Sequence, residues 1–386
     1  MRRVRCVAWF VIAAAFCWLT LAAPVDLAGQ SEPAGSPTWR FAVSGDSRNC
    51  GDIVMPAIAE GARRDGARFY WHLGDFRAGS HVDEDIAQRP EYKSRTLSED
   101  EYLKLEWQDF INNQLAPFGS TPVFLGIGNH ENYGHTRVNG SFAENRADYV
   151  RIFHRWLDAE PIRQARQEDG DYTIKPYYHW TDHGIDFVTL DNATDDQFDD
   201  EQMKWVHKVL AKDESDPKVQ GIVLGMHKAL PDSISYTHSM SEAMNVTSIS
   251  SGREVYRELL KAQNDAHKHV YIIASHSHFF MDNTFNTSFW KGNGGVLPGW
   301  IVGTAGAQRY PLPEGWREAG LAIQHVYGYL LGIVNPRADE GSPADGSIRF
   351  EYKLLNKSDV PPAVEQRFSP NLVDFCFDQN ASTRSL

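Results

Sequence analysis

Short apolar runs and helical repeats alternate along most of the chain. Five apolar runs predict buried strands, at 39–46, 67–75, 122–131, 219–227 and 269–278. Apolar residues at helical spacing predict helices at 52–64, 98–115, 199–212 and 253–263. The second helix begins with a Ser-x-x-Glu pattern at Ser98, and the third places Met203, Val206 and Leu210 on one face. This alternation predicts an α/β fold.

The second half of the chain also contains β-rich segments. Two antiparallel strands joined near His183-Gly184 are predicted within 175–192. Later apolar runs predict three more strands, at 300–306, 326–335 and 347–356. We therefore expect one domain over 38–356 and a C-terminal tail over 357–386.

The N-terminal segment has the layout of an export signal. Three arginines precede an uncharged, mostly apolar run from Cys6 to Ala23. We expect residues 1–29 to be either a cleaved signal peptide or a retained membrane anchor, followed by a linker over 30–37. Both alternatives predict an exported protein, periplasmic or extracellular. In such a compartment Cys50 and Cys376 either form a disulfide or remain two thiols.

The charge balance limits the partners. The formal net charge of the 386 residues is −13, and without residues 1–29 it is about −15. Such an acidic chain disfavours long nucleic acids. An anionic substrate would need a local positive charge, which a metal cluster would supply. The sequence does not indicate an oligomeric state.

The five predicted strands end in residues that bind metals. They are followed by Asp46, by Asp75, by Asn129-His130-Glu131, by His227, and by His276-x-His278. Active sites of α/β sheets lie at the carboxyl ends of strands, so we expect these residues to meet. Carboxylate, amide and imidazole donors without thiolate suit two divalent or trivalent ions such as Mn, Fe or Zn.

In chain order the motifs are "GDSR", "GDFR", "GNHE", "GMH" and "SHSH". This series resembles the calcineurin-like metallophosphoesterases, which include the purple acid phosphatases, over roughly residues 38–310. The resemblance implies a four-layer α-β-β-α double β-sandwich with a dinuclear metal centre at one edge. It implies six metal ligands: Asp46, Asp75, Asn129, His227, His276 and His278. Asp75 would bridge both ions, Asp46 and His278 would complete one, and the other three would complete the second.

The resemblance also implies the catalytic roles. His130 would protonate the leaving oxygen and be oriented by Glu131, while a metal-bound hydroxide attacks phosphorus in line. Separately from the resemblance, Asp191-Asn192 end a later predicted strand, and we expect them to support the ligands.

Two positions depart from the family pattern. Ser275 replaces a glycine, and we expect little effect. Arg48 stands where the family most often has a metal-binding histidine, and arginine only donates hydrogen bonds. Arg48 therefore either contacts the substrate phosphate or pairs with a nearby acid. Arg77, two residues after Asp75, is a second candidate for phosphate contact.

These observations predict an exported metal-dependent phosphoesterase that acts on small phosphate mono- or diesters. The alternative is a non-catalytic phosphate- or ligand-binding protein, with a metal site weakened by Arg48. A metallo-β-lactamase-like hydrolase is disfavoured, because Phe279-Phe280 follow the His-x-His pair where that fold needs Asp-His. We expect long insertions to select the substrate, at 77–100, 132–170 and 228–250.

Overall fold

A computed structural model describes residues 38–132, 142–193, 197–242, 246–338 and 343–383. Residues Pro37–Leu386 form one compact unit, which includes the C-terminal segment. The predicted signal or anchor and the linker lie outside the described residues. Among the helices that are described, none combines the length and the apolar composition needed to cross a membrane.

The first sheet has five strands in the order β12-β11-β1-β2-β3. Its strands are β1 (Trp39–Ser44), β2 (Ala67–His72), β3 (Val123–Leu125), β11 (Tyr327–Val334) and β12 (Ile348–Leu355). Strands β1, β2 and β3 run parallel, whereas β11 is antiparallel to β1. The loops after β1, β2 and β3 therefore leave the sheet at the same edge.

The second sheet has seven strands in the order β10-β8-β9-β7-β6-β5-β4. Its strands are β4 (Tyr178–Asp182), β5 (Ile185–Thr189), β6 (Gly221–Met226), β7 (His269–Ala274), β8 (Phe280–Asp282), β9 (Gly299–Val302) and β10 (Ala322–Ile323). The predicted hairpin is confirmed, since β4 and β5 are antiparallel and Asp182 faces Ile185 across a two-residue turn. Strands β5, β6, β7 and β9 run parallel.

Aromatic side chains fill the space between the two sheets. Phe41 of β1 packs edge-on against Phe187 of β5, with ring centroids 5.0 Å apart. Trp71 of β2 packs likewise against Trp180 of β4, at 5.3 Å. Trp71 also lies against the backbone of Gly225, where an added Cβ would come within 2.1 Å of the indole. The central aromatic layer therefore depends on a glycine in β6.

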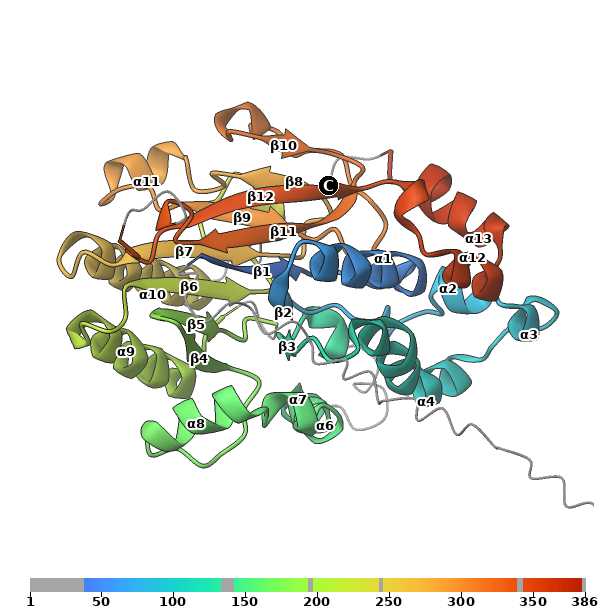
Figure 1. Ribbon diagram of the computed structural model, residues 1–386, viewed down its shortest axis with the longest axis horizontal. Coiled ribbons are helices and arrows are strands. Elements are labelled where there is room, and N and C mark those ends of the chain that lie inside the picture. Colours follow the sequence, from blue (N-terminus) through green and yellow to red (C-terminus); the bar gives the residue numbers. More distant parts are fainter. Residues whose placement is uncertain (1–37, 133–141, 194–196, 243–245, 339–342, 384–386) are drawn as a thin grey trace, which may run out of the picture. The chain divides into compact units, whose positions relative to one another are not determined.

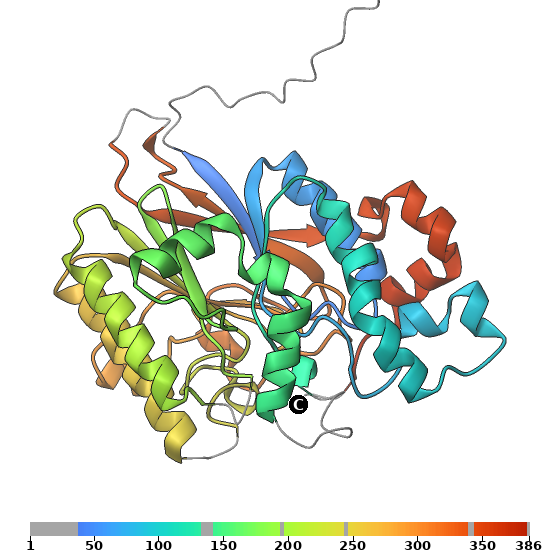
Figure 2. The same ribbon diagram turned by 90° about the horizontal axis from the view of Figure 1, so that it is seen from below.

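Helices cover both outer faces of the sheets. Helix α1 (Gly51–Arg64) packs on the five-stranded sheet, and α10 (Val246–Asn264) packs on the seven-stranded sheet beside α9 (Asp200–Ser215). Figure 2 shows the two sheets between these helical layers. The predicted α-β-β-α sandwich is confirmed.

Most of the remaining α-helices lie in or next to the long insertions and in the C-terminal segment, whereas α11 lies between β8 and β9 (Figure 1). They are α2 (Glu84–Ala87), α3 (Pro90–Lys93), α4 (Glu99–Phe110), α6 (Phe142–Ile152), α7 (His154–Leu157), α8 (Glu160–Glu168), α11 (Ser288–Gly292), α12 (Pro362–Phe368) and α13 (Pro370–Asp374). The capping box predicted at Ser98 is confirmed. The predicted helix changes to a π-helix at Ile111–Leu115.

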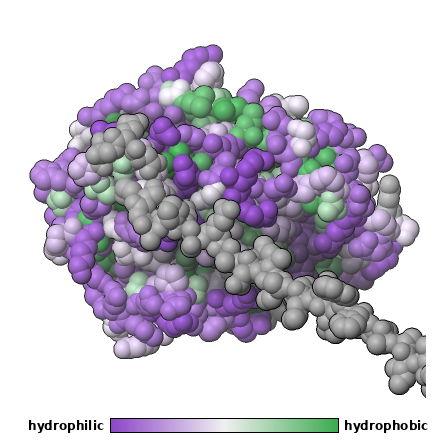
Figure 3. Space-filling view, viewed as in Figure 1, coloured by the Kyte–Doolittle hydropathy of each residue, from purple (hydrophilic) through white to green (hydrophobic). Residues whose placement is uncertain are grey.

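The C-terminal segment is fastened to the domain. Helix α12 contacts α1, and Cys376 forms a disulfide with Cys50 at the start of α1, with Cα atoms 5.8 Å apart. Of the two alternatives for these cysteines, the structure has the disulfide. The face of the molecule seen in Figure 3 is mostly hydrophilic, as expected for an acidic chain.

Candidate metal centre

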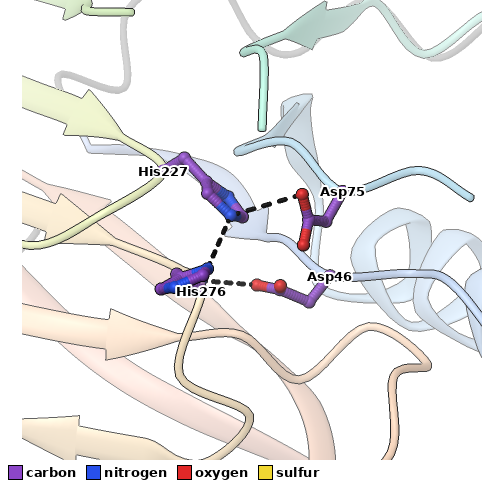
Figure 4. A group of neighbouring side chains, drawn as sticks. All are labelled: Asp46, Asp75, His227 and His276. Carbon is purple, nitrogen blue, oxygen red and sulfur yellow. Dashed lines mark hydrogen bonds and ion pairs between the residues drawn. The ribbon is translucent and has the colours of Figure 1, made fainter. Parts of the chain in front are cut away.

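Loops from both sheets bring the predicted ligands together. Asp46 and Asp75 follow β1 and β2 of one sheet, and His227 and His276 follow β6 and β7 of the other. Each offers a ligand atom, and these four atoms all lie within 4.8 Å of one another. Figure 4 shows the two carboxylates facing the two imidazoles. The carboxyl ends of parallel strands thus build a site shared by both sheets, as predicted.

The backbone is left-handed at three of these residues. The φ angles are 61° at Asp46, 59° at Asp75 and 63° at His276. Such values are uncommon for residues other than glycine and concentrate at functional sites. Gly128 belongs to the same arrangement, because an added Cβ would lie 2.3 Å from Asp75 Oδ1. These sharp turns direct the ligand atoms inward, and the sequence motifs indicate them only through their glycines.

Four donor atoms surround a first candidate position for a metal ion. His227 Nε2 lies 2.9 Å from Asn129 Oδ1, 3.0 Å from His276 Nδ1 and 3.3 Å from Asp75 Oδ1. His227 Nδ1 lies 3.0 Å from the carbonyl oxygen of Leu73. Because a carbonyl only accepts, Nδ1 carries the hydrogen, and when the ring gives up its other proton the lone pair is at Nε2. Converging lone pairs of this kind fit a metal ion.

A second candidate position for a metal ion lies on the other side of Asp75. His278 Nε2 is 3.2 Å from Asp46 Oδ1. Asp46 Oδ1 and Asp75 Oδ2 are buried and accept no hydrogen bond within the described part of the chain. Buried carboxylate oxygens without partners are costly, which makes them suitable ligands for a cation. Arg48 also reaches this position, with Nη2 3.2 Å from His278 Nε2.

The charges of the centre are strongly coupled. Burial opposes ionisation of both carboxyls, yet His278 and His227 hold the pKa of Asp46 below its usual value, and His130 and His227 hold the pKa of Asp75 well below. Burial also opposes a charge on His227, but Asp75 raises the pKa of that ring to about 9. The carboxylates therefore stay ionised and require positive charge beside them.

His130 lies beside Asp75 with one ring nitrogen held. Its Nδ1 lies 2.5 Å from the carbonyl oxygen of Ala78, and its Nε2 is directed toward Asp75 Oδ2 at 3.7 Å. Burial lowers the pKa of His130 to about 4. Its position next to the ligands suits contact with a substrate, and its acid role stays a prediction.

The prediction that Glu131 orients His130 is wrong. Both Glu131 oxygens accept backbone N–H groups instead, from Asp75 at 2.9 Å, from Phe76 at 2.7 Å and from Gly128 at 2.6 Å. Glu131 thus joins the loop after β2 to the loop after β3. The Ala78 carbonyl has the orienting role that was predicted for Glu131.

The prediction that Arg77 contacts the substrate is wrong as well. Its side chain is fully buried and forms ion pairs with Asp52, Asp85 and Asp109. Arg89 shares two of these carboxylates, Asp52 and Asp109. Charged residues in a polar insertion usually face solvent, so no sequence pattern indicates this internal network.

Of the predicted pair Asp191-Asn192, the second residue contacts the segment next to His227 and the first pairs elsewhere. Asp191 pairs with Arg146 at 2.8 Å, whereas its neighbour Asn192 makes two hydrogen bonds to the backbone of Lys228, next to His227. Ser275 is not a neutral replacement for glycine, because its hydroxyl donates to Asp46 Oδ2. The sequence showed only that a small residue stood there.

Comparison with known proteins agrees with this site and fold. The family model of the calcineurin-like phosphoesterases matches residues 40–280, which include all five motifs. The chain belongs to this family of metal-dependent phosphoester hydrolases. No curated protein matches the sequence.

Solved structures are similar to this chain at low sequence identity, and one of them shows the same fold. One described as the structure of PhoD has 14% identity and a TM-score of 0.51, covering 78% of this chain and 64% of that one. A dimetal phosphatase from Danio rerio has 15% identity and a TM-score of 0.43, covering 77% and 93%. The second likeness is too distant to carry an argument, and the first concerns the fold alone.

Proposed function

We propose that this chain is an exported metal-dependent phosphoesterase that hydrolyses small phosphate mono- or diesters. The observation that carries the proposal is the meeting of two carboxylates, an amide oxygen and three imidazoles at the strand ends of both sheets. Two carboxylate oxygens there are buried and accept no hydrogen bond from described residues. Export is supported by the N-terminal sequence pattern and by the Cys50–Cys376 disulfide.

The donor set fits Mn, Fe or Zn. Asp75, Asn129, His227 and His276 would hold an ion at the first position, and Asp46, Asp75 and His278 form the second. When bound, such ions lower the pKa of water and stabilise charge on the phosphoryl oxygens.

The chain's own residues would bind and orient the ester. The Arg48 guanidinium matches phosphate oxygens in geometry and charge, and its side chain is 15% exposed at the site. His130 is held at Nδ1 by the Ala78 carbonyl oxygen, so Nε2 is the ring atom that would exchange a proton with a leaving oxygen. Tyr310 stacks on the His278 ring with centroids 4.1 Å apart and fixes its orientation.

An assay of an aryl phosphate monoester beside the matching diester tests the proposal. The purified chain, freed of metal by a chelator, would be reloaded separately with Mn²⁺, Zn²⁺ or iron. We expect turnover only after reloading, and the ratio of the two rates assigns the substrate class. Bound metal without turnover of either ester would instead favour the non-catalytic alternative.

A further inference from the structure

Arg48 lies inside the centre and not at its rim. It follows Asp46 by two residues in the loop after β1, and its side chain is only 15% exposed. Its Nη2 is 3.2 Å from His278 Nε2 and its Nε is 3.7 Å from Asp75 Oδ2. The two partners of Arg48, His278 Nε2 and Asp75 Oδ2, are together with Asp46 Oδ1 the donor atoms of the second metal position.

Arg48 uses the electron pair that a metal would need from His278. His278 Nδ1 lies 2.7 Å from the carbonyl oxygen of Gln308, so Nδ1 carries the hydrogen. The neutral ring then has a single lone pair, at Nε2, and the guanidinium can only donate to it. One lone pair cannot accept this hydrogen bond and bind a metal ion at the same time.

Charge leads to the same conclusion. The guanidinium is always ionised, and it neutralises part of the charge of Asp46 and Asp75. A second divalent ion bound to His278 would share this ring with a fixed positive charge, since Arg48 Nη2 lies 3.2 Å from His278 Nε2. At the first position, by contrast, no donor atom is hydrogen-bonded to Arg48 among the described contacts.

We propose that Arg48 replaces the second metal ion, so that each chain holds one tightly bound ion, at Asp75, Asn129, His227 and His276. The ion and the guanidinium would then hold the phosphate from two sides. This inference rests on the proposed function, and it modifies the two-ion centre that the family resemblance implies.

Counting bound Mn²⁺ tests the proposal without an activity assay. The metal-free chain is titrated with Mn²⁺, the bound ions are counted by elemental analysis, and the loaded protein is examined by electron paramagnetic resonance. We expect one tight ion and the spectrum of isolated Mn²⁺ in the wild type. Arg48→His should bind a second ion and give the spectrum of a spin-coupled pair. The matched control is Arg151→His, at an exposed arginine paired with Asp148, and it should behave as the wild type.

The outcomes separate this proposal from the one on which it rests. Two equally tight, coupled ions in the wild type would overturn the role of Arg48 and leave the metal-dependent function standing. A single ion in a folded Arg48→His would also overturn it. If that variant does not fold, Arg48→Gln replaces it and should bind the second Mn²⁺ at least tenfold more tightly than the wild type. No tight Mn²⁺ in any variant would overturn the metal centre itself.

Discussion

Asp46 shows how one residue is prepared as a ligand. Its left-handed backbone, with φ of 61°, turns the side chain toward the other sheet. There its Oδ2 accepts from the Ser275 hydroxyl and from the His276 backbone N–H, the latter at 2.7 Å. The other oxygen, Oδ1, is left without a hydrogen bond from the described residues. One carboxylate oxygen is thus held in place, and the other is left available to bind a metal ion.

Ser275→Ala should weaken binding at the centre, because Asp46 loses the hydroxyl that fixes its Oδ2. Removing an outer partner of a metal ligand typically costs about 10–100-fold in affinity. Calorimetric titration with Mn²⁺ measures the effect. Ser277→Ala is the matched control, since this equally buried hydroxyl bonds Ser235 at 2.7 Å and not a ligand. Equal affinities in both variants would contradict the role of Ser275.

His130→Ala should lower kcat by roughly 10²–10⁴-fold for an ester with a poor leaving group, because proton donation is lost. The loss should be smaller for p-nitrophenyl esters, whose leaving group needs little protonation. Steady-state rates across a series of leaving groups provide the measurement, with metal content checked in parallel. His154→Ala, at an exposed residue of α7, is the control. A loss independent of the leaving group would exclude the acid role.

At the scale of elements, the polar insertion after β2 is fixed by buried charge. Arg77 and Arg89 bind carboxylates that come from α1, from α4 and from the insertion itself. This network joins the five-stranded sheet's outer helices to the loop that carries Ala78. The loop in turn fixes His130, so the network positions the site without touching a substrate.

Arg77→Met should therefore destabilise the fold and leave substrate binding intact. Removing one partner of a buried ion pair costs about 3–5 kcal/mol, because unpaired carboxylates stay buried. Urea unfolding measures the loss, and KM is determined where the variant is still folded. Arg95→Met is the control, since its exposed pair with Glu101 should contribute less than about 1 kcal/mol. A raised KM at unchanged stability would restore the substrate role.

Sequence patterns located the candidate ligands because strand ends can be recognised from apolar runs. They predicted the hairpin at His183, the helices α1, α9 and α10, and the loops that meet at the centre. They could not show the burial of Arg77, since a charged insertion has the same pattern whether its charges face inward or outward. Strands β8 and β10, which are three and two residues long, were not predicted. The direction of the Arg48 side chain depends on tertiary packing.

At the scale of the whole molecule, stability should depend on pH through His179 in β4. Its ring lies between Asp186 at 2.9 Å and Asp169 at 2.9 Å, with Asp213 nearby. Burial opposes a charge on the ring, but Asp186 and Asp169 raise the pKa of His179 to about 10. A histidine with a raised pKa stabilises the fold by its full amount when the pH is below the ordinary histidine pKa near 6.5. This stabilisation is lost as the pH rises through about 10.

His179→Gln removes this contribution. We expect the variant to be less stable than the wild type by roughly 3 kcal/mol at pH 6, with the difference vanishing toward pH 10. Urea midpoints of both proteins between pH 6 and pH 10 measure it. A difference that stays constant over this range would show that packing, and not charge, is what the variant loses.

The proposed function depends above all on Asp75 and the surrounding imidazoles, which would form a metal centre that hydrolyses phosphate esters. The most direct test is the release of p-nitrophenol from the aryl esters while metal-free protein is titrated with Mn²⁺, for the wild type and for Asp75→Asn. We expect a rate that rises with bound Mn²⁺ until the site is filled, and neither tight binding nor turnover in the variant. Turnover by the metal-free protein, or full turnover by Asp75→Asn, would contradict it.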